Sequence, residues 1–415
     1  MAEGRANDGG VQAGGDVRTL WLLLVATTAV QVLATYSSYT IAAIAPDVAA
    51  GIGMSPELVG FQVSLLYTGA TLSSTTAGFQ LRRWGAVRIS QASVAFSVIG
   101  ASCAIWPSLV TIGIGSLIMG LGYGMTNPAA AHLLMQVAPA RQRNLIFSLK
   151  QTGVPLGGVA AGLVSPPVSQ AFGWQWALAL TAIIGAVLLF VLQPLRRRWD
   201  ADRDPGARFD RNLFDGLLIV ARSRYFRWVS ANGFFYAAVQ LTLGTFIVTL
   251  LVTETGMGLV AAGTVLAVVQ AVGVGGRVLW GWLADRFGNG QRIIVLIGVV
   301  SAVGALVTTT VDASWPRLAL YALFAVFGAA ALGWTGVMQA EISNASPPGR
   351  SGAIVGGVSA PTYAGVIFGP AAFSVAFGAI GSYADTFVIV ALFALCGMAC
   401  ILVAGRSRAA AAQQE

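Results

Sequence analysis

Long apolar runs recur along the whole chain, from Leu20 to Val403, and they constrain the fold more than any other feature. Each run holds about 20 residues, which as a helix is long enough to cross a hydrocarbon core of roughly 30 Å. Only 10% of the residues are charged and 56% are hydrophobic, whereas a soluble domain carries about 25% charged residues. The runs are continuous rather than alternating in polarity, so we predict an all-α protein that crosses a lipid bilayer many times.

We predict twelve transmembrane helices, arranged as two six-helix bundles in a 6+6 repeat. Their expected ranges are 18–45, 57–79, 89–107, 110–135, 146–168, 174–195, 227–252, 259–283, 291–312, 318–342, 352–379 and 383–405. The bundles would occupy residues 18–195 and 227–405, joined by a charged, solvated linker at 196–226. Residues 1–17 and 406–415 are expected to be cytoplasmic tails, the first of them disordered.

The distribution of basic residues predicts the orientation. Arginines gather in the connections that follow the even-numbered spans, beginning with Arg82, Arg83 and Arg88, whereas the opposite connections are largely acidic. Basic loops stay in the cytoplasm, so we expect both termini there, in a protein of the cell inner membrane. This bias also accounts for the net charge of +8, and no nucleic-acid partner is expected.

Two pairs of short segments repeat at one spacing. Residues 78–85 (GFQLRRWG) follow the second span, and residues 281–288 (GWLADRFG) follow the eighth. Met135-Gln136 recurs as Met338-Gln339, so that both pairs are offset by 203 residues, from 78 to 281 and from 135 to 338. A shared offset predicts a six-span unit duplicated in parallel. Such bundles are typical of secondary transporters, in which the substrate site lies between the repeats.

The segment GWLADRFGNGQR at 281–292 resembles the loop signature Gly-x-Leu-x-Asp-Arg-x-Gly-x-x-x-Arg of the major facilitator superfamily. The resemblance covers the chain apart from its tails, and it implies two halves that rock against each other. It also implies that Asp285 and Arg286 latch the cytoplasmic helix ends in one state of the cycle. In the first copy Arg82, followed by Arg83, stands where the acid is expected. We assign gating roles to these four residues and expect a monomer; the alternative is that the charges only set topology.

Lys150 is the only lysine of the chain, and it lies in an apolar, glycine-rich segment. A charge in such a place is a functional-site hypothesis by default. It shares a helical face with Gly153, Gly157 and Ala161, and small residues at that spacing let helices pack closely. We therefore predict that the ammonium points into protein and meets an anionic group of the substrate. The alternative is a lysine that snorkels to the cytoplasmic interface.

Arg277 is the counterpart of Lys150 on the eighth span. It shares one polar, small-residue face with Gln270, Gly273 and Gly281. An arginine fork matches a carboxylate well, and an arginine on this span resembles that of oxalate and monocarboxylate transporters in the superfamily. We predict that Arg277 also contacts the substrate. The alternative is that Arg277 pairs with the neighbouring signature segment.

Acidic residues are absent from the middle of every predicted span. A transporter of organic cations would need a buried carboxylate, so two buried cations favour an anionic substrate instead. Proton-driven drug exporters usually carry an arginine in the fourth span, near Arg-x-x-x-Gly, where this chain has Ser116 before Gly120. Their fifth-span signature, Gly-Pro-x-x-Gly-Gly, is present only as VPLGG at 154–158. Both departures weaken the exporter interpretation.

Further polar residues on the spans are candidates for hydrogen bonds to the substrate, although each by itself fits an interhelical hydrogen bond or a packing role better. They are Gln31, Tyr36, Tyr39, Tyr123, Asn127, Gln151, Asn232, Tyr236, Gln240, Gln270, Trp334 and Tyr363. Asn232, Tyr236 and Gln240 recur at four-residue spacing and share one face, which predicts a cavity-facing stripe. His132 is the only histidine, and it is a candidate for carrying a coupling proton or for a structural role.

No nucleotide-binding loop, catalytic triad or metal-ligand pattern is visible in the sequence, so we expect neither a cofactor nor an enzyme. The sequence favours a secondary transporter that moves a small organic anion, such as a carboxylate, by proton symport or anion exchange. One alternative is a proton-coupled exporter of drugs or of metabolites such as siderophores. A receptor on a transporter scaffold and a membrane enzyme find less support, because neither a signalling domain nor a catalytic constellation is expected.

Overall fold

The computed structural model describes residues 17–139, 142–200, 203–206, 215–347 and 351–412, and the regular elements in these ranges are helices. The first half contains α1 (Val17–Ala43), α2 (Ala45–Ile52), η1 (Pro56–Leu58), α3 (Val59–Thr75), α4 (Ala77–Trp84), α5 (Ala86–Ala104), α6 (Leu109–Val137), α7 (Arg143–Gln151), α8 (Gly153–Phe172) and α9 (Trp174–Leu192). The linker contributes η3 (Gln193–Leu195), α10 (Arg196–Trp199) and α11 (Asp215–Arg222). The second half contains α12 (Arg224–Thr255), α13 (Leu259–Phe287), α14 (Gly290–Thr308), α15 (Arg317–Ala345), α16 (Ser351–Ile380) and α17 (Tyr383–Ala412).

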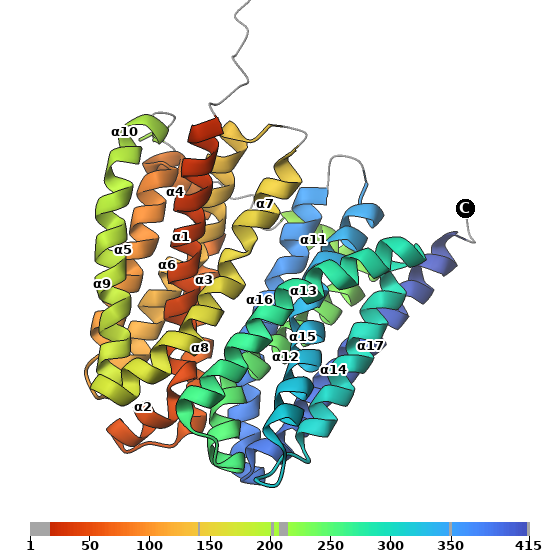
Figure 1. The fold of residues 1–415 in the computed structure, drawn as a ribbon. Coiled ribbons are helices and arrows are strands. Elements are labelled where there is room, and N and C mark those ends of the chain that lie inside the picture. The colour runs from red at the N-terminus through yellow and green to blue at the C-terminus, as the bar shows by residue number, and fades with distance from the viewer. Residues whose placement is uncertain (1–16, 140–141, 201–202, 207–214, 348–350, 413–415) are drawn as a thin grey trace, which may run out of the picture.

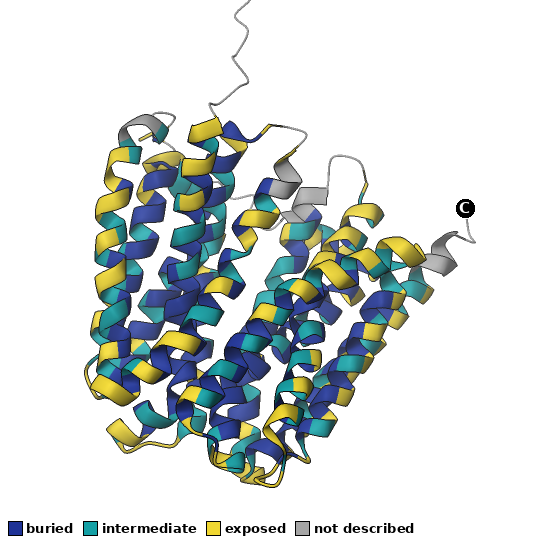
Figure 2. Cartoon of the chain, viewed as in Figure 1, coloured by how far each residue is buried: buried dark blue, intermediate teal, exposed yellow. Residues whose placement is uncertain are grey.

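The helices form two groups that stand side by side, α1–α9 in one and α12–α17 in the other (Figure 1). The first turn of α1 and the last turn of α17 lie at the same end of the molecule (Figure 1), as an even number of spans requires. Exposed residues follow the outer face of α9, while buried residues line the inner sides of both groups (Figure 2). Phe190 on α9 is 81% exposed, which is the pattern of a helix that faces lipid.

Every predicted span coincides with helix. Among the described residues, ten single helices are long and apolar enough to cross a membrane: α1, α5, α6, α9 and α12–α17. The second predicted span is divided into α3 and α4, and the fifth into α7 and α8. The short helix α2 meets the segment from η1 into α3 at 115°, so α2 is a connection and not part of the second span.

The break between α3 and α4 has a local cause in a run of hydroxyl side chains. Ser73, Ser74, Thr75 and Thr76 each donate a hydrogen bond to a backbone carbonyl three or four residues earlier. Such side-chain donors compete with the backbone N–H groups for the same carbonyls and bend helices. The helix therefore breaks at Thr76 and resumes at Ala77.

Two pairs of glycines show that the sequence repeat is also a structural repeat. Gly53 and Gly256 have φ angles of 65° and 67°, and Gly85 and Gly288 have φ angles of 90° and 62°. Each pair is 203 residues apart, and each glycine ends a helix. Glycine is the residue that adopts positive φ angles at little cost. The repeated segments 78–85 and 281–288 therefore form helix C-termini, although the predicted spans place most of each in a loop.

The linker is not solvated throughout, contrary to our prediction. Asp200 is only 5% exposed. Its Oδ1 accepts a hydrogen bond from the backbone N–H of Val87 at 2.8 Å, and its Oδ2 accepts one from Arg88 at 3.0 Å. A carboxylate in this position caps the N-terminus of α5 and offsets the helix dipole there. Any side chain at Gly85 would collide with the Asp200 carboxylate, which explains the glycine at that position.

Replacing Asp200 by alanine should lower the free energy of unfolding by about 1–2 kcal/mol, because two N–H groups at the start of α5 lose their acceptor. Thermal unfolding of the purified protein in detergent measures this effect. Asp204→Ala is the matched control, since Asp204 is exposed and, among the described residues, its side chain accepts only from the nearby Gly206 N–H. Equal melting temperatures for the two variants would contradict the capping role.

The two halves are in contact near the end that carries Glu57. A Cβ atom on Gly162 of α8 would meet the carbonyl oxygen of Gly263 of α13, and the reverse also holds. The Ser64 hydroxyl donates to the carbonyl of Ile367 at 2.5 Å, and the Ser374 hydroxyl donates to that of Glu57 at 2.6 Å. These contacts close the end of the molecule that we predict to be periplasmic.

Candidate functional site

Lys150 lies in the last turn of α7, where the fifth span is broken. Pro155 has no N–H, so it cannot donate to the carbonyl of Gln151 four residues earlier, and α7 ends at Gln151. The one residue between the two helices, Thr152, keeps helical dihedral angles (φ −64°, ψ −18°). The fifth span is therefore interrupted at Pro155 without being unwound.

Three amide oxygens surround the Lys150 ammonium. Its Nζ donates to Oε1 of Gln31 at 2.8 Å, to Oδ1 of Asn127, and to Oε1 of Gln151 at 3.4 Å. We call these three residues the amide cage. The Lys150 side chain is only 2% exposed, which contradicts the snorkelling alternative, because a snorkelling ammonium reaches water.

The amide cage satisfies the hydrogen bonds of Lys150 but leaves its charge without an opposite charge. Among the described residues, no carboxylate contacts the ammonium. The predicted packing face is confirmed at two positions, because added side-chain atoms on Gly153 or Gly157 would meet Gln31 or Thr35 of α1. Lys150 is therefore held against α1 by close helix packing.

A polar face of α1 leads from Lys150 toward the second half. Gln31, Thr35 and Tyr39 follow one another at four-residue spacing, and the Gln31 amide donates to the Thr35 hydroxyl at 3.3 Å. The hydroxyl of Tyr123 on α6 lies beside Thr35, and that of Tyr39 lies beside Gln270 on α13. We call this series the polar track. It crosses from the first half to the second.

Arg277 lies at the far end of the polar track. It is half-buried on α13, and its Nε donates to the carbonyl of Leu332 at 3.2 Å. The hydroxyls of Tyr123 and Tyr39 lie near its guanidinium. Tyr123 is one helical turn from Asn127, and Tyr39 is two turns from Gln31, so these side chains connect the surroundings of Lys150 with those of Arg277.

Arg277 also has no carboxylate partner in the described part of the chain. Asp285, the acid of the signature segment, is exposed and makes no side-chain hydrogen bond or ion pair with a described residue. The alternative that Arg277 pairs with this segment is therefore contradicted. The two Nη groups of the guanidinium remain available for a bidentate contact with an anion.

The side-chain amide of Gln270 carries a hydrogen-bond donor that meets no acceptor. Its side chain is 2% exposed, and although it lies beside Tyr39, its Nε2 meets no acceptor in hydrogen-bond geometry. It lies at the contact between the halves, because an added Cβ on Gly158 of α8 would collide with it. Leaving a buried donor unpaired costs about 1–3 kcal/mol, so this group is poised to bind an acceptor.

Tyrosines gather around the polar track. The rings of Tyr67 and Tyr123 pack edge to face with their centroids 5.5 Å apart, and Tyr363 on α16 interacts with both. Sequence reasoning missed Tyr67, which no charged neighbour marks, and also Thr35. The four-residue spacing from Gln31 through Thr35 to Tyr39 is the signal that would have found Thr35.

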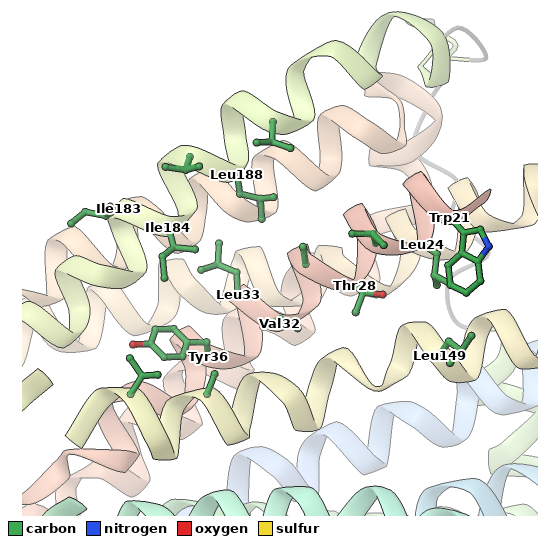
Figure 3. Close-up of a pocket in the computed structure, with 16 residues that line it drawn as sticks. Trp21, Leu24, Thr28, Val32, Leu33, Tyr36, Leu149, Ile183, Ile184 and Leu188 are labelled. Carbon is green, nitrogen blue, oxygen red and sulfur yellow. The ribbon is translucent and has the colours of Figure 1, made fainter. Parts of the chain in front are cut away.

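Tyr36 does not belong to this site, contrary to our prediction. Its hydroxyl accepts a hydrogen bond from Ser165 of α8 at 3.3 Å. Its ring lines an apolar groove of about 800 Å³ on the outer surface between α1, α8 and α9. Figure 3 shows Tyr36 in this groove with Leu33, Ile184 and Leu188 around it. Successive residues of a helix are rotated by 100° about its axis, so Tyr36 does not share the helical face of its neighbour Thr35.

The predicted stripe on α12 is corrected at Asn232 and Tyr236, which are buried and bond within the second half, whereas a substrate role for Gln240 and Trp334 stays a prediction. The Asn232 amide is fully buried and donates to the carbonyl of Gly397 at 2.9 Å, and the Tyr236 hydroxyl donates to that of Ile294 at 2.7 Å. The Trp334 indole N–H donates to Oε1 of Gln240 at 3.0 Å. These side chains join α12 to α17, α14 and α15, and they meet their partners inside one bundle.

The four gating residues lie at helix ends, away from the polar track. The side chains of Arg82, Arg83, Asp285 and Arg286 are all exposed or half-buried. The Arg83 guanidinium lies 5.8 Å from the ring centroid of Phe79, and the Arg82 carbonyl accepts from the Asp204 N–H at 2.7 Å. A latch role for Asp285 and Arg286 stays a prediction. So does a proton-carrying role for His132, which is half-buried on α6.

Comparisons with known proteins agree with this architecture. The family model of the Major Facilitator Superfamily matches residues 27–356. The gallate transporter of Pseudomonas putida is 24% identical over 358 residues, 79% of this chain and 78% of that protein. The 4-hydroxybenzoate transporter PcaK of Acinetobacter baylyi is 23% identical over 344 residues, 74% of each chain. This chain aligns with smaller shares of other curated relatives, and for one of them the alignment covers 33% of that protein.

Solved structures show the same fold. A bacterial homologue of the human lysosomal transporter Spinster, in an inward-facing and unoccupied conformation, superposes with a TM-score of 0.75 at 16% identity. The superposition covers 95% of this chain and 98% of that one. It confirms the predicted all-α membrane fold, and the family excludes the membrane-enzyme alternative. With a family match over most of its length, the chain belongs to the major facilitator superfamily.

Proposed function

We propose that the protein is a secondary transporter of small aromatic carboxylates. One observation carries this proposal: Lys150 and Arg277 lie on one polar track between the halves, and neither has a carboxylate partner among the described residues. Charges held away from water are costly unless an opposite charge accompanies them. A bound anion supplies that charge, whereas an organic cation would be repelled.

In this proposal Arg277 holds the carboxylate of the substrate. Its Nε is occupied by the Leu332 carbonyl, which orients the guanidinium and leaves two Nη groups for a fork-shaped contact. The unpaired Nε2 of Gln270 donates a third hydrogen bond. The positive charge of Lys150, on the same polar track, adds to the attraction for an anion.

The aromatic nature of the substrate is supported by the tyrosines and by the relatives. Tyr67 and Tyr123 offer ring edges against which a substrate ring can pack. Tyr39 and Tyr363 add hydroxyls on the same track, which suit substrates that carry phenolic groups. The gallate and 4-hydroxybenzoate transporters named above act on molecules of this kind.

Transport would proceed by rocking of the halves. The hydrogen bonds from Ser64 and Ser374 join the halves at the end near Glu57, while Asp285 at the opposite end has no ion pair with a described residue. We expect the two ends of the molecule to close alternately. When the contacts near Glu57 open, Asp285 and Arg286 would form the contacts that hold the cytoplasmic helix ends together.

A panel of matched ligands tests the proposal. In proteoliposomes, labelled 4-hydroxybenzoate and gallate should bind and exchange, whereas 4-hydroxybenzamide, which has the same ring without the charge, should not compete. The cation tyramine should be excluded too. Binding of the amide or of tyramine in place of the acids would contradict the proposal. Energy-dependent extrusion of unrelated drugs or siderophores from cells would support the exporter alternative instead.

A further inference from the structure

We propose that Lys150 is the proton carrier of this transporter, so that its ammonium forms when the anionic substrate binds and gives up one proton when the substrate leaves. This inference rests on the proposed function, because it concerns the same site and the same substrate. It specifies proton symport as the coupling, and it assigns the proton to a residue for which the sequence predicts only substrate binding.

Few groups in this membrane protein can carry a proton. Carboxylates are common proton relays in transporters, but the sequence has none in the middle of a span. Arg277 cannot lose its proton in a protein, and tyrosine hydroxyls ordinarily titrate near pH 10. The remaining candidates for the proton carrier are Lys150 and His132. Of these two, Lys150 lies on the polar track and is 2% exposed, whereas His132 is five residues beyond Asn127 on α6, nearer the helix end.

The amide cage suits both protonation states of Lys150. In the charged state Gln31, Asn127 and Gln151 present three oxygens to the three N–H donors of the ammonium. Each amide also carries an NH₂ group, so one rotated amide can donate to the lone pair of a neutral amine. A carboxylate in the same place could only accept hydrogen bonds and would keep the lysine charged.

The surroundings of Lys150 make its charge depend on an anion. The charged or titratable groups on α7 and on the helices packed against it are Arg143 on α7, Arg18, Tyr36 and Tyr39 on α1, and Tyr123 and His132 on α6, while α8 has none. None of them is an acid, and Arg277 at the other end of the polar track is also a cation. An isolated buried ammonium costs several kcal/mol. The substrate carboxylate therefore supplies the charge that stabilises the ammonium.

In this transport cycle one proton moves across the membrane with each substrate carboxylate. On the outer side a proton from water forms the third N–H bond on Nζ of Lys150 as the carboxylate binds. On the inner side the carboxylate departs, the same N–H bond breaks, and the proton passes to water. A monovalent carboxylate and one proton carry no net charge together, so transport is electroneutral. A pH gradient of about one unit, acid outside, can then support about a tenfold accumulation of the anion.

The uniqueness of Lys150 allows a direct test in the wild-type protein. Lysine labelled with ¹³C at Cε gives a single side-chain signal, because the chain has one lysine. Without substrate we expect the signal to move between the amine and the ammonium positions as the pH is varied. With saturating 4-hydroxybenzoate it should stay at the ammonium position over the same range. A signal that stays at the ammonium position under both conditions would overturn the inference.

A charge-locked variant tests the coupling. Lys150→Arg keeps the positive charge but cannot release a proton. We expect its accumulation of 4-hydroxybenzoate under a pH gradient to fall from severalfold to none, a larger loss than that of its counterflow of the same acid in proteoliposomes. Protein-free liposomes correct for passive entry of the neutral acid. His132→Gln is the matched control and should keep both activities.

The outcomes separate this inference from the proposed function. If the wild type neither binds nor exchanges an aromatic acid, the proposed function fails. If the wild type exchanges the acid and Lys150→Arg still accumulates it against a pH gradient, only the proton-carrier inference fails. If coupling is lost in His132→Gln and kept in Lys150→Arg, the proton belongs to His132 instead. Should Lys150→Arg not fold, the NMR titration of the wild type decides the matter.

Discussion

Arg277→Gln should lower the affinity for 4-hydroxybenzoate by about ten- to hundredfold. The substitution removes the only group on the polar track whose charge is permanent and whose two Nη atoms are free for a fork-shaped contact. Loss of a hydrogen bond to a charged group costs about 1.5–3 kcal/mol, which corresponds to that range of affinity. Equilibrium binding of the labelled acid to purified protein measures the change.

Two comparisons sharpen this test. Arg317→Gln is the matched control, because Arg317 is exposed at the start of α15, about 22 Å along that helix from Leu332, the residue that Arg277 contacts. Its affinity should equal that of the wild type. Arg277→Lys keeps the charge but loses the fork-shaped guanidinium, so its affinity should lie between those of the wild type and Arg277→Gln. Unchanged binding by Arg277→Gln would remove Arg277 from the substrate site.

Gly263→Val should reduce transport by about five- to hundredfold and open the end of the molecule near Glu57. An added Cβ at Gly263 would meet the carbonyl oxygen of Gly162 and, at 2.6 Å, the ring of Pro166. Overpacking costs about 1–3 kcal/mol, which shifts a two-state equilibrium by roughly five- to hundredfold. The strain exists only while the halves are in contact there, so it disfavours that state.

Thiol labelling reports this opening independently of transport. In a background without the native cysteines, Ser64→Cys should be labelled faster when Gly263 is valine, because Ser64 lies against Ile367 across the contact. Gly275→Val is the matched control on the same helix, since nothing lies within 4 Å of an added Cβ there. An equal loss of transport in both valine variants, without faster labelling, would show general damage to α13 rather than a shift between states.

Several features of the site were predictable because they depend on local energetic costs. Lys150 and Arg277 stand out in the sequence, since a charge within an apolar span is retained only where it serves a purpose. The close packing of Gly153 and Gly157 against α1 also followed from their spacing. The predicted spans carry no acid in their middle, and this property of the sequence alone disfavours a cationic substrate.

Other features depend on which neighbours the fold provides. Asn232 and Tyr236 have the spacing of a cavity-facing stripe, yet each bonds to a carbonyl of a neighbouring helix in the same bundle. Their periodicity defines a face of α12 but not what that face meets. Tyr67 and Asp200 were missed for the same reason, because their partners are distant in sequence.

The sequence by itself therefore determined the membrane-spanning class, the duplicated halves and the two intramembrane cations. These follow from hydrophobic length, repeat spacing and the cost of buried charge, which act within one segment. Only the tertiary structure decided that Lys150 is enclosed by three amides and joined to Arg277 by a polar track from α1 and α6. Hydrogen bonds need partners within about 3 Å, and only the packing of helices from both halves brings those partners together.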